Sequence, residues 1–116
     1  MREELIERVS AIANSTKLGD GFDPDTEMGP LVSRDQYERV TRYINSGNDE
    51  GATLMAGGSE RPAGLEKGHF VKPTVFTGAS NEMSVVREEI FGPVVCVQPF
   101  EELDDVIARG NDTAYG

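Results

Sequence analysis

The sequence predicts an α/β fold, a partial open sheet with helices beside it, and two observations support this prediction. Apolar residues recur at helical spacing near the start of the chain, in its first half and again near its end. Short β-branched or apolar runs lie between the second and the third of these stretches. The resulting order of helix, helix, strand, strand, strand and helix is typical of part of an open α/β sheet.

The composition argues against several classes of protein. At 116 residues the chain is one domain's worth of sequence, long enough to bury a core. Its 21 acidic and 11 basic residues leave a formal net charge of −10, which argues against nucleic acid or an anionic membrane as a partner. The single cysteine rules out an intramolecular disulfide. With no signal peptide and no run long enough to span a membrane, we expect a cytoplasmic protein.

A first helix is predicted at the start of the chain and should end between Asn14 and Leu18. Its apolar residues fall on one face, namely Leu5, Val9, Ile12 and Ala13. Residues 19–32 are rich in Gly, Asp and Pro and are predicted to form a loop. The alternating acidic residues of this loop lack the glycine and the closing glutamate of a calcium loop, so we expect no metal site there.

A second helix is predicted to begin after Ser33, because Ser33 and Gln36 form a capping-box pattern. One face of this helix carries Tyr37, Val40, Thr41 and Ile44, and the helix should end by Gly51. Three arginines lie largely elsewhere on it, namely Arg34, Arg39 and Arg42. They form either a small anion-binding patch or a solvated face with local ion pairs, and the pattern favours the solvated face.

The second half of the chain alternates extended segments and turns. Thr53–Ala56 is a plausible strand, residues 57–69 form a connection, and the only histidine, His69, is a loop residue within it. Phe70–Thr77 is predicted to be extended, with Pro73 indicating an edge or irregular position. Met83–Arg87 fits a turn or a short helix.

Val94–Phe100 is the clearest strand of the sequence, and its β-branched residues indicate a buried position. A last helix should follow it, with Leu103, Val106 and Ile107 facing inward. Gly110–Asn111 supplies a stop signal for this helix.

The stretch Arg87–Val97 carries the most informative chemistry. It crosses a polar surface, bends at Gly92–Pro93 and enters the clearest strand. The carboxylates of Glu88 and Glu89 and the ring of Phe91 are therefore expected at the end of the sheet where this strand begins. An ionised carboxylate can accept hydrogen bonds from two neighbouring sugar hydroxyls, and an aromatic ring can pack on a flat heterocycle. In the alternative interpretation Glu88 and Glu89 are solvated, Phe91 belongs to the core and Gly-Pro is a turn. Spacing alone favours this alternative.

Glu88–Val94 resembles the E-E-[IV]-F-G-P-V signature of the NAD(P)-dependent aldehyde dehydrogenase superfamily. Further stretches resemble that family in the same order along the chain, namely Gly29–Ser33, Phe70–Thr74 and Asn111–Gly116. Leu65–Gly68 and Cys96 are similar to the betaine aldehyde dehydrogenase branch. One departure is Arg109–Gly110 before Asn111, where the family more often has an alanine directly before the asparagine.

The resemblance implies roles for individual residues. Family members attack the aldehyde with a cysteine thiolate, pass hydride to NAD(P) and release the acid with a glutamate-activated water. By motif position Glu89 would bind the nicotinamide ribose hydroxyls, Phe91 would border the nicotinamide, and Glu88 would be a structural neighbour. Cys96 is not expected to be the nucleophile. It lies inside a strand pattern and downstream of the cofactor motif, whereas the family nucleophile lies upstream.

The resemblance also implies that residues 1–116 are a single partial domain, the C-terminal part of an aldehyde dehydrogenase catalytic domain. We therefore expect no catalytic residue in this chain, no activity of the isolated chain and only weak binding of NAD or NADP, between which the sequence does not choose. We expect self-association as a homodimer or a higher oligomer. An alternative of a different class is a non-catalytic α/β module that associates with itself or with a complementary chain.

Overall fold

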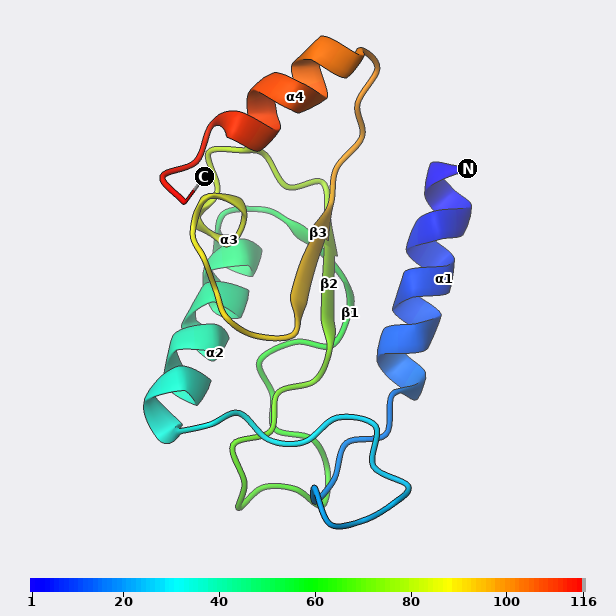
Figure 1. Ribbon diagram of the computed structural model, residues 1–116, viewed down its shortest axis with the longest axis vertical. Coiled ribbons are helices and arrows are strands. Elements are labelled where there is room, and N and C mark those ends of the chain that lie inside the picture. The colour runs from blue at the N-terminus through cyan, green and yellow to red at the C-terminus, as the bar shows by residue number, and fades with distance from the viewer. Residues whose placement is uncertain (116) are drawn as a thin grey trace.

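A computed structural model describes residues 1–115 as three layers, with a small sheet between helices. Figure 1 views the sheet on edge, with α1 on one side and with α2 and α3 on the other. Gly116, the last residue of the family-like stretch that begins at Asn111, lies outside the described residues. The predicted α/β fold class is confirmed, and a short helix forms between the last two strands. In chain order the elements are α1 (Arg2–Ser15), α2 (Arg34–Asp49), β1 (Thr53–Ala56), β2 (Thr74–Thr77), α3 (Ser84–Arg87), β3 (Val94–Val97) and α4 (Leu103–Asn111).

The sheet has the order β1-β2-β3, with β1 antiparallel and β3 parallel to the middle strand. Pro73 was assigned to an edge or an irregular position, and the edge assignment is wrong, because Pro73 directly precedes the middle strand β2. Proline is tolerated there since the ladder begins one residue later, where the Thr74 amide donates to the Pro93 carbonyl at 2.8 Å. The side chains of β2 are almost fully buried from Thr74 to Phe76.

The core lies between α2 and β2. Ser33 caps α2 as predicted, because its hydroxyl accepts the Gln36 backbone N–H at 3.2 Å. Val40 and Ile44 are fully buried and share one apolar cluster with Phe76 of the middle strand. Gly47 makes this packing tight, since a Cβ added to it would lie 3.0 Å from the Phe76 ring. The predicted inner face of α2 is therefore correct at its centre.

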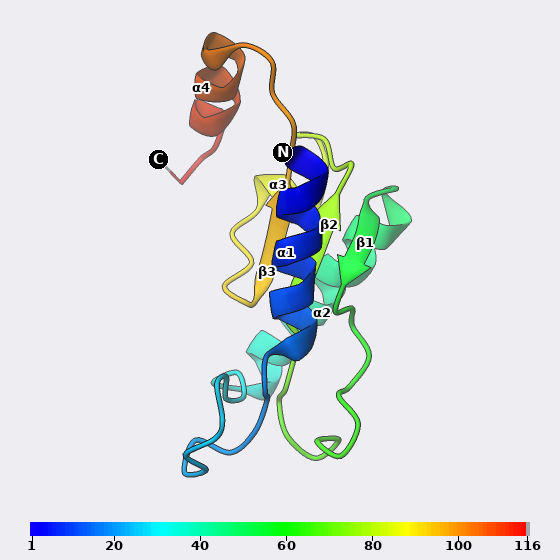
Figure 2. The ribbon, with the colours of Figure 1, turned by 90° about the vertical axis from the view of Figure 1, so that its right-hand side faces the viewer.

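The bounds of α1 agree with the prediction, but its predicted inner face is only partly right. Ile6 and Ser10 are the buried residues of α1, whereas Leu5 and Ile12 are exposed. The physical reason is that α1 contacts β1 and β2 along a single side. Figure 2, which looks at α1 in front of the sheet, shows this arrangement.

The end of the chain departs most from the sequence predictions. β3 stops at Val97 rather than at Phe100, and it is not buried, because Val95 is exposed and its neighbours are half-buried. Within residues 1–115, β3 pairs with β2 along one edge only. Leu103 and Ile107 were predicted to face inward and are instead 66% and 51% exposed. Figure 2 shows α4 set apart from the sheet, beyond the end of β3.

Among the described residues, none of the helices has both the length and the apolar character that crossing a membrane requires.

Candidate functional site

The candidate site is the loop of residues 88–93, which joins α3 to the amino end of β3. In Figure 1 this yellow segment leaves α3, descends past α2 and turns up into β3. Arg87 ends the short helix α3, so of the two structures that the sequence allowed for Met83–Arg87, a turn or a short helix, the helix is the one that forms. The bend at Gly92–Pro93 also lies where the sequence predicted it, with Val94 as the first residue of the strand.

The two glutamates of the loop differ in their surroundings, although both are exposed. A Glu88 carboxylate oxygen accepts a hydrogen bond from the Tyr115 hydroxyl at 2.8 Å, and this bond raises the pKa of Tyr115. Within residues 1–115 the Glu89 carboxylate accepts no hydrogen bond and forms no ion pair. Glu88 is therefore occupied by an intramolecular contact, and Glu89 remains a free acceptor.

Phe91 has an unusual backbone and an exposed ring. Its φ of 55° makes it the only non-glycine residue with positive φ among residues 1–115. A left-handed backbone costs a non-glycine residue about 1–2 kcal/mol, so the surrounding contacts must favour it. The Phe91 side chain is 70% exposed, whereas Ile90 beside it is buried in the core. The interpretation that placed Phe91 in the core is therefore wrong, because Ile90 anchors the loop instead.

Two side chains of α2 bind the loop through its backbone. The Gln36 side-chain amide donates to the carbonyls of Ile90 at 3.0 Å and of Phe91 at 2.6 Å. The Arg39 guanidinium donates to the Glu89 carbonyl at 2.8 Å. The next loop residue packs against the helix, since a Cβ added to Gly92 would lie 2.5 Å from a methyl carbon of Val40. The loop is therefore docked along one side of α2.

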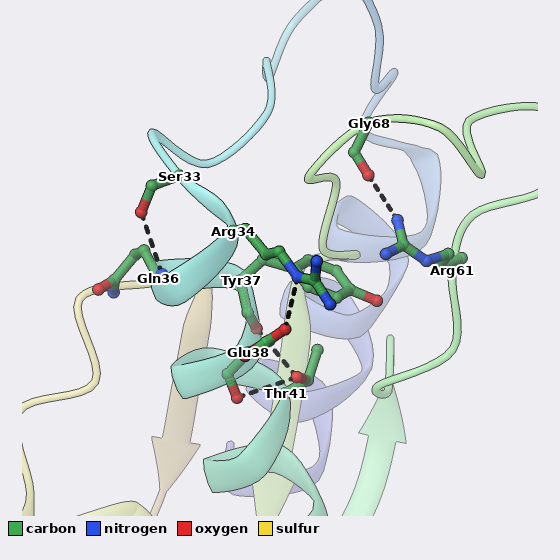
Figure 3. Close-up of polar contacts among 8 residues, drawn as sticks. All are labelled: Ser33, Arg34, Gln36, Tyr37, Glu38, Thr41, Arg61 and Gly68. Carbon is green, nitrogen blue, oxygen red and sulfur yellow. Dashed lines mark hydrogen bonds and ion pairs between the residues drawn. The ribbon is translucent and has the colours of Figure 1, made fainter.

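These contacts correct two interpretations of α2. Half of the predicted capping box forms, because Ser33 accepts from the Gln36 backbone while the Gln36 side chain turns to the loop (Figure 3). Arg34 makes the expected local pair with Glu38 at 2.8 Å, also drawn in Figure 3. Arg39 is not part of a solvated face, as it is half-buried and bonded to the loop. The sequence signal for both contacts is weak, since the partners lie 50 to 55 positions away.

The other end of α2 holds α3 in place. The Glu50 carboxylate accepts the Ser84 backbone N–H at 2.8 Å and the Ser84 hydroxyl at 2.9 Å. The Ser84 side chain is the main reason that the pKa of Glu50 lies below its ordinary value. Met83, the N-cap of α3, makes no side-chain cap of its own. The helix that leads into the loop is therefore capped by a residue that follows α2.

Cys96 is the third residue of β3, the strand that follows the loop. Its sulfur is 3.7 Å from the Val85 carbonyl oxygen, and partial burial raises the pKa of the thiol. A raised pKa lowers the fraction of thiolate, which is the reactive form. The environment of Cys96 therefore suits a packed thiol better than a nucleophile.

Three acidic side chains of the loop near the start of the chain contact Lys17. The Lys17 ammonium lies 3.8 Å from Asp23 and 3.6 Å from Asp25. The Lys17 amide donates to the Glu27 carboxylate at 2.7 Å. In the part of the chain that the structure describes, no group of three or more His, Cys, Asp or Glu side chains is arranged to hold a metal ion.

The whole chain resembles known proteins of one family. The model of the aldehyde dehydrogenase family matches residues 1–116. A betaine aldehyde dehydrogenase of Brucella anthropi is 46% identical over 117 residues, which cover 100% of this chain and 24% of that protein. The putative aldehyde dehydrogenase DhaS of Bacillus subtilis is 46% identical over 114 residues, covering 98% of this chain and 22% of that protein.

Solved structures show the same likeness in three dimensions. The NAD+ complex of an aldehyde dehydrogenase from Bacillus cereus is 53% identical with a TM-score of 0.93, covering 99% of this chain and 23% of that one. The NAD+ complex of a Mycobacterium tuberculosis aldehyde dehydrogenase is 41% identical with a TM-score of 0.92, covering 99% of this chain and 24% of that one. The chain thus spans about a quarter of the length of the relatives it matches.

Proposed function

The chain belongs to the aldehyde dehydrogenase family, and we propose that residues 1–116 supply the nicotinamide-ribose corner of an NAD site. The protein that contains this corner would oxidise an aldehyde to a carboxylic acid, and bound NAD would accept the hydride. The observation that carries the proposal is a free Glu89 carboxylate in the same loop as the exposed side chain of Phe91, two residues later. NAD rather than NADP is favoured by the relatives of known structure that hold NAD+.

The residues of the loop fit a ribose and a flat ring. Glu89 offers two acceptor oxygens that no group among residues 1–115 occupies, and the two hydroxyls of a ribose need such acceptors. Glu88 is the poorer candidate because the Tyr115 hydroxyl already bonds it. Phe91 exposes most of its ring, so a heterocycle can stack or abut on it without displacing core contacts.

The proposed reaction also needs a reactive thiolate and a general base, and this chain offers no good candidate for the thiolate. Burial of Cys96 disfavours its ionised form. We therefore propose that residues 1–116 alone do not oxidise aldehydes and bind NAD weakly. One charge-assisted ribose contact contributes about 1.5–3 kcal/mol, whereas association costs at least about 4 kcal/mol. Micromolar affinity of the isolated chain in calorimetry would contradict this.

Betaine aldehyde is the substrate that we propose for testing first. The support is the 46% identity to betaine aldehyde dehydrogenases of several Brucella species. The same degree of identity to DhaS, which is named only as a putative aldehyde dehydrogenase, makes simple aliphatic aldehydes the comparison substrates.

The role of Glu89 is testable in a chimera with a full-length relative, which supplies the rest of an aldehyde dehydrogenase. Residues 1–116 replace the aligned segment of the Bacillus cereus relative, which is 53% identical over nearly all of this chain. Glu89→Gln should weaken NAD binding roughly tenfold, because the neutral amide loses a charge-assisted acceptor. Glu88→Gln is the matched control, since it makes the same change on the adjacent residue and should alter the Kd little. Equal Kd values for the two variants would overturn the proposal.

A second proposal concerns self-association. Within residues 1–115 the outer edge of β3 is unpaired, and apolar side chains of the strand and of the segment after it are exposed, including Val95 and Phe100. An open edge with exposed apolar neighbours is a surface on which a second copy can pair. We expect sedimentation velocity to show a dimer that dissociates on dilution. A strictly monomeric species at tens of micromolar would contradict the proposal.

A further inference from the structure

We propose that Gln36 and Arg39 are positioning residues that hold the loop of residues 88–93 in the conformation presenting Glu89 and Phe91, an inference that rests on the proposed function. The role belongs to two side chains of α2 that donate hydrogen bonds to backbone oxygens of the loop. It assigns a purpose to a glutamine and an arginine that the sequence marks only as a capping residue and a surface charge.

The first step is the pattern of acceptors. Three consecutive carbonyls of the loop, those of Glu89, Ile90 and Phe91, all accept hydrogen bonds from these two side chains. Because the bonds engage the backbone, they orient the peptide planes and leave the Glu89 carboxylate and the Phe91 ring free. Such an arrangement organises a ligand-binding loop before the ligand arrives.

The second step is the left-handed backbone at Phe91. The Ile90 and Phe91 carbonyls belong to the two peptide units that flank the Phe91 Cα. Both meet the side-chain nitrogen of Gln36, at 3.0 and 2.6 Å. Satisfying both oxygens with one nitrogen restricts φ and ψ of Phe91 together, which explains how a non-glycine residue keeps a φ of 55°.

The third step is the packing of the helix that carries the two donors. The side chain of Arg39 extends from α2 to the loop, and its guanidinium carbon lies 5.5 Å from the centre of the Tyr43 ring. Val40, the residue after it, is fully buried and closes against Gly92. The donors therefore project from a helix whose inner face is buried in the core, and the loop follows the surface of that helix.

The experiment uses two loop variants and one matched control. Gln36→Glu keeps the length of the side chain and the capping pattern but cannot donate to a carbonyl. Arg39→Gln removes a charge that contacts the loop, and Arg42→Gln removes one from an exposed arginine on the same helix. Arg39→Lys restores a cationic donor and should recover part of the effect.

The first readout follows the loop of the full chain without any cofactor. Chymotrypsin cleavage after Phe91 is compared with cleavage after Phe22, an exposed residue outside the loop. Gln36→Glu and Arg39→Gln should raise the Phe91-to-Phe22 ratio roughly five- to tenfold, and Arg42→Gln should leave it unchanged. A rise at both sites together would indicate general loosening and would overturn the proposal.

The second readout is the KM for NAD in the chimera with the Bacillus cereus relative. Both loop variants should raise this KM roughly five- to tenfold while leaving the KM for the aldehyde within about twofold. An unchanged cleavage ratio would overturn the inference. A changed ratio with unchanged KM values for Glu89→Gln and for both loop variants would sustain the positioning role and refute the cofactor role of the loop.

Discussion

The helices α2 and α4 have similar amphipathic sequences but differ in how far their apolar side chains are buried. α2 buries Val40 and Ile44 completely, whereas α4 leaves Leu103 66% and Ile107 51% exposed. A helical pattern states which side of a helix prefers to leave water, and burial then depends on what lies opposite. α2 packs against the middle strand and against the loop of residues 88–93. α4 is held by polar contacts instead, such as the hydrogen bond that the Asn81 side chain donates to the Arg109 carbonyl at 3.5 Å.

This difference bears on function because the candidate site depends on α2. The donors Gln36 and Arg39 and the packing residue Val40 all come from that helix. Glu50, which follows it, caps the short helix at the other end of the loop. The geometry of the loop should therefore be as stable as the core beneath it, and perturbations of α4 should matter less. The predictions below test this contrast, beginning with the largest expected effect.

Truncation in the α2 core should be the most damaging change. Ile44→Ala removes fully buried atoms between α2 and the sheet and should lower the free energy of unfolding by roughly 2–5 kcal/mol. Urea titration followed by circular dichroism measures it. A loss under about 1 kcal/mol would mean that α2 is not the packed half of the molecule.

The close approach of the loop to α2 should be sensitive to one added methyl group. Gly92→Ala would place a Cβ 2.5 Å from a methyl carbon of Val40, and the clash should cost roughly 1–3 kcal/mol. In a double-mutant cycle Val40→Ala should make the alanine at position 92 less costly, because the space opens. Strict additivity of the two changes would contradict the packing of Gly92 on α2.

The Glu50 cap of α3 should make stability depend on pH. The pKa of Glu50 is lowered in the folded chain. The ionised carboxylate therefore adds to the free energy of unfolding above the unfolded pKa of 4.5, and this stabilisation is lost as pH falls through the folded value. Glu50→Gln should therefore be less stable than the parent at pH 7 and equal to it at acidic pH below both values. Urea titrations at pH 7 and at low pH give the two differences. A gap that persists in acid would assign the effect to something other than the charge.

Truncation on α4 should have the smallest effect. Ile107→Ala makes the same kind of change as Ile44→Ala on an exposed side chain, and it should alter the free energy of unfolding by no more than about 0.5 kcal/mol. The same urea titration applies. A loss comparable to that of Ile44→Ala would show that α4 is covered in solution, and a loss that grows with protein concentration would identify a second copy as the cover.

The sequence by itself determined the order of the elements, the capped start of α2 at Ser33, the end of α1 and the turn at Gly92–Pro93. These features depend on spacing, capping and turn residues within a few positions of one another, where local preferences act directly. The signature Glu88–Val94 also identified the family, which the match over residues 1–116 confirmed. The roles of Glu89 and Phe91 remain proposals that follow from that membership.

Only the tertiary structure decided which apolar faces are covered and where the polar side chains of α2 point. Leu103 and Ile44 look equivalent in a helical pattern, and they differ because the sheet lies opposite one of them and not the other. The Gln36 side chain can bond the start of its own helix or a distant carbonyl, and in the folded chain it donates to the Ile90 carbonyl, 54 positions away. Long-range contacts of this kind depend on how the elements pack, so no local rule contains them.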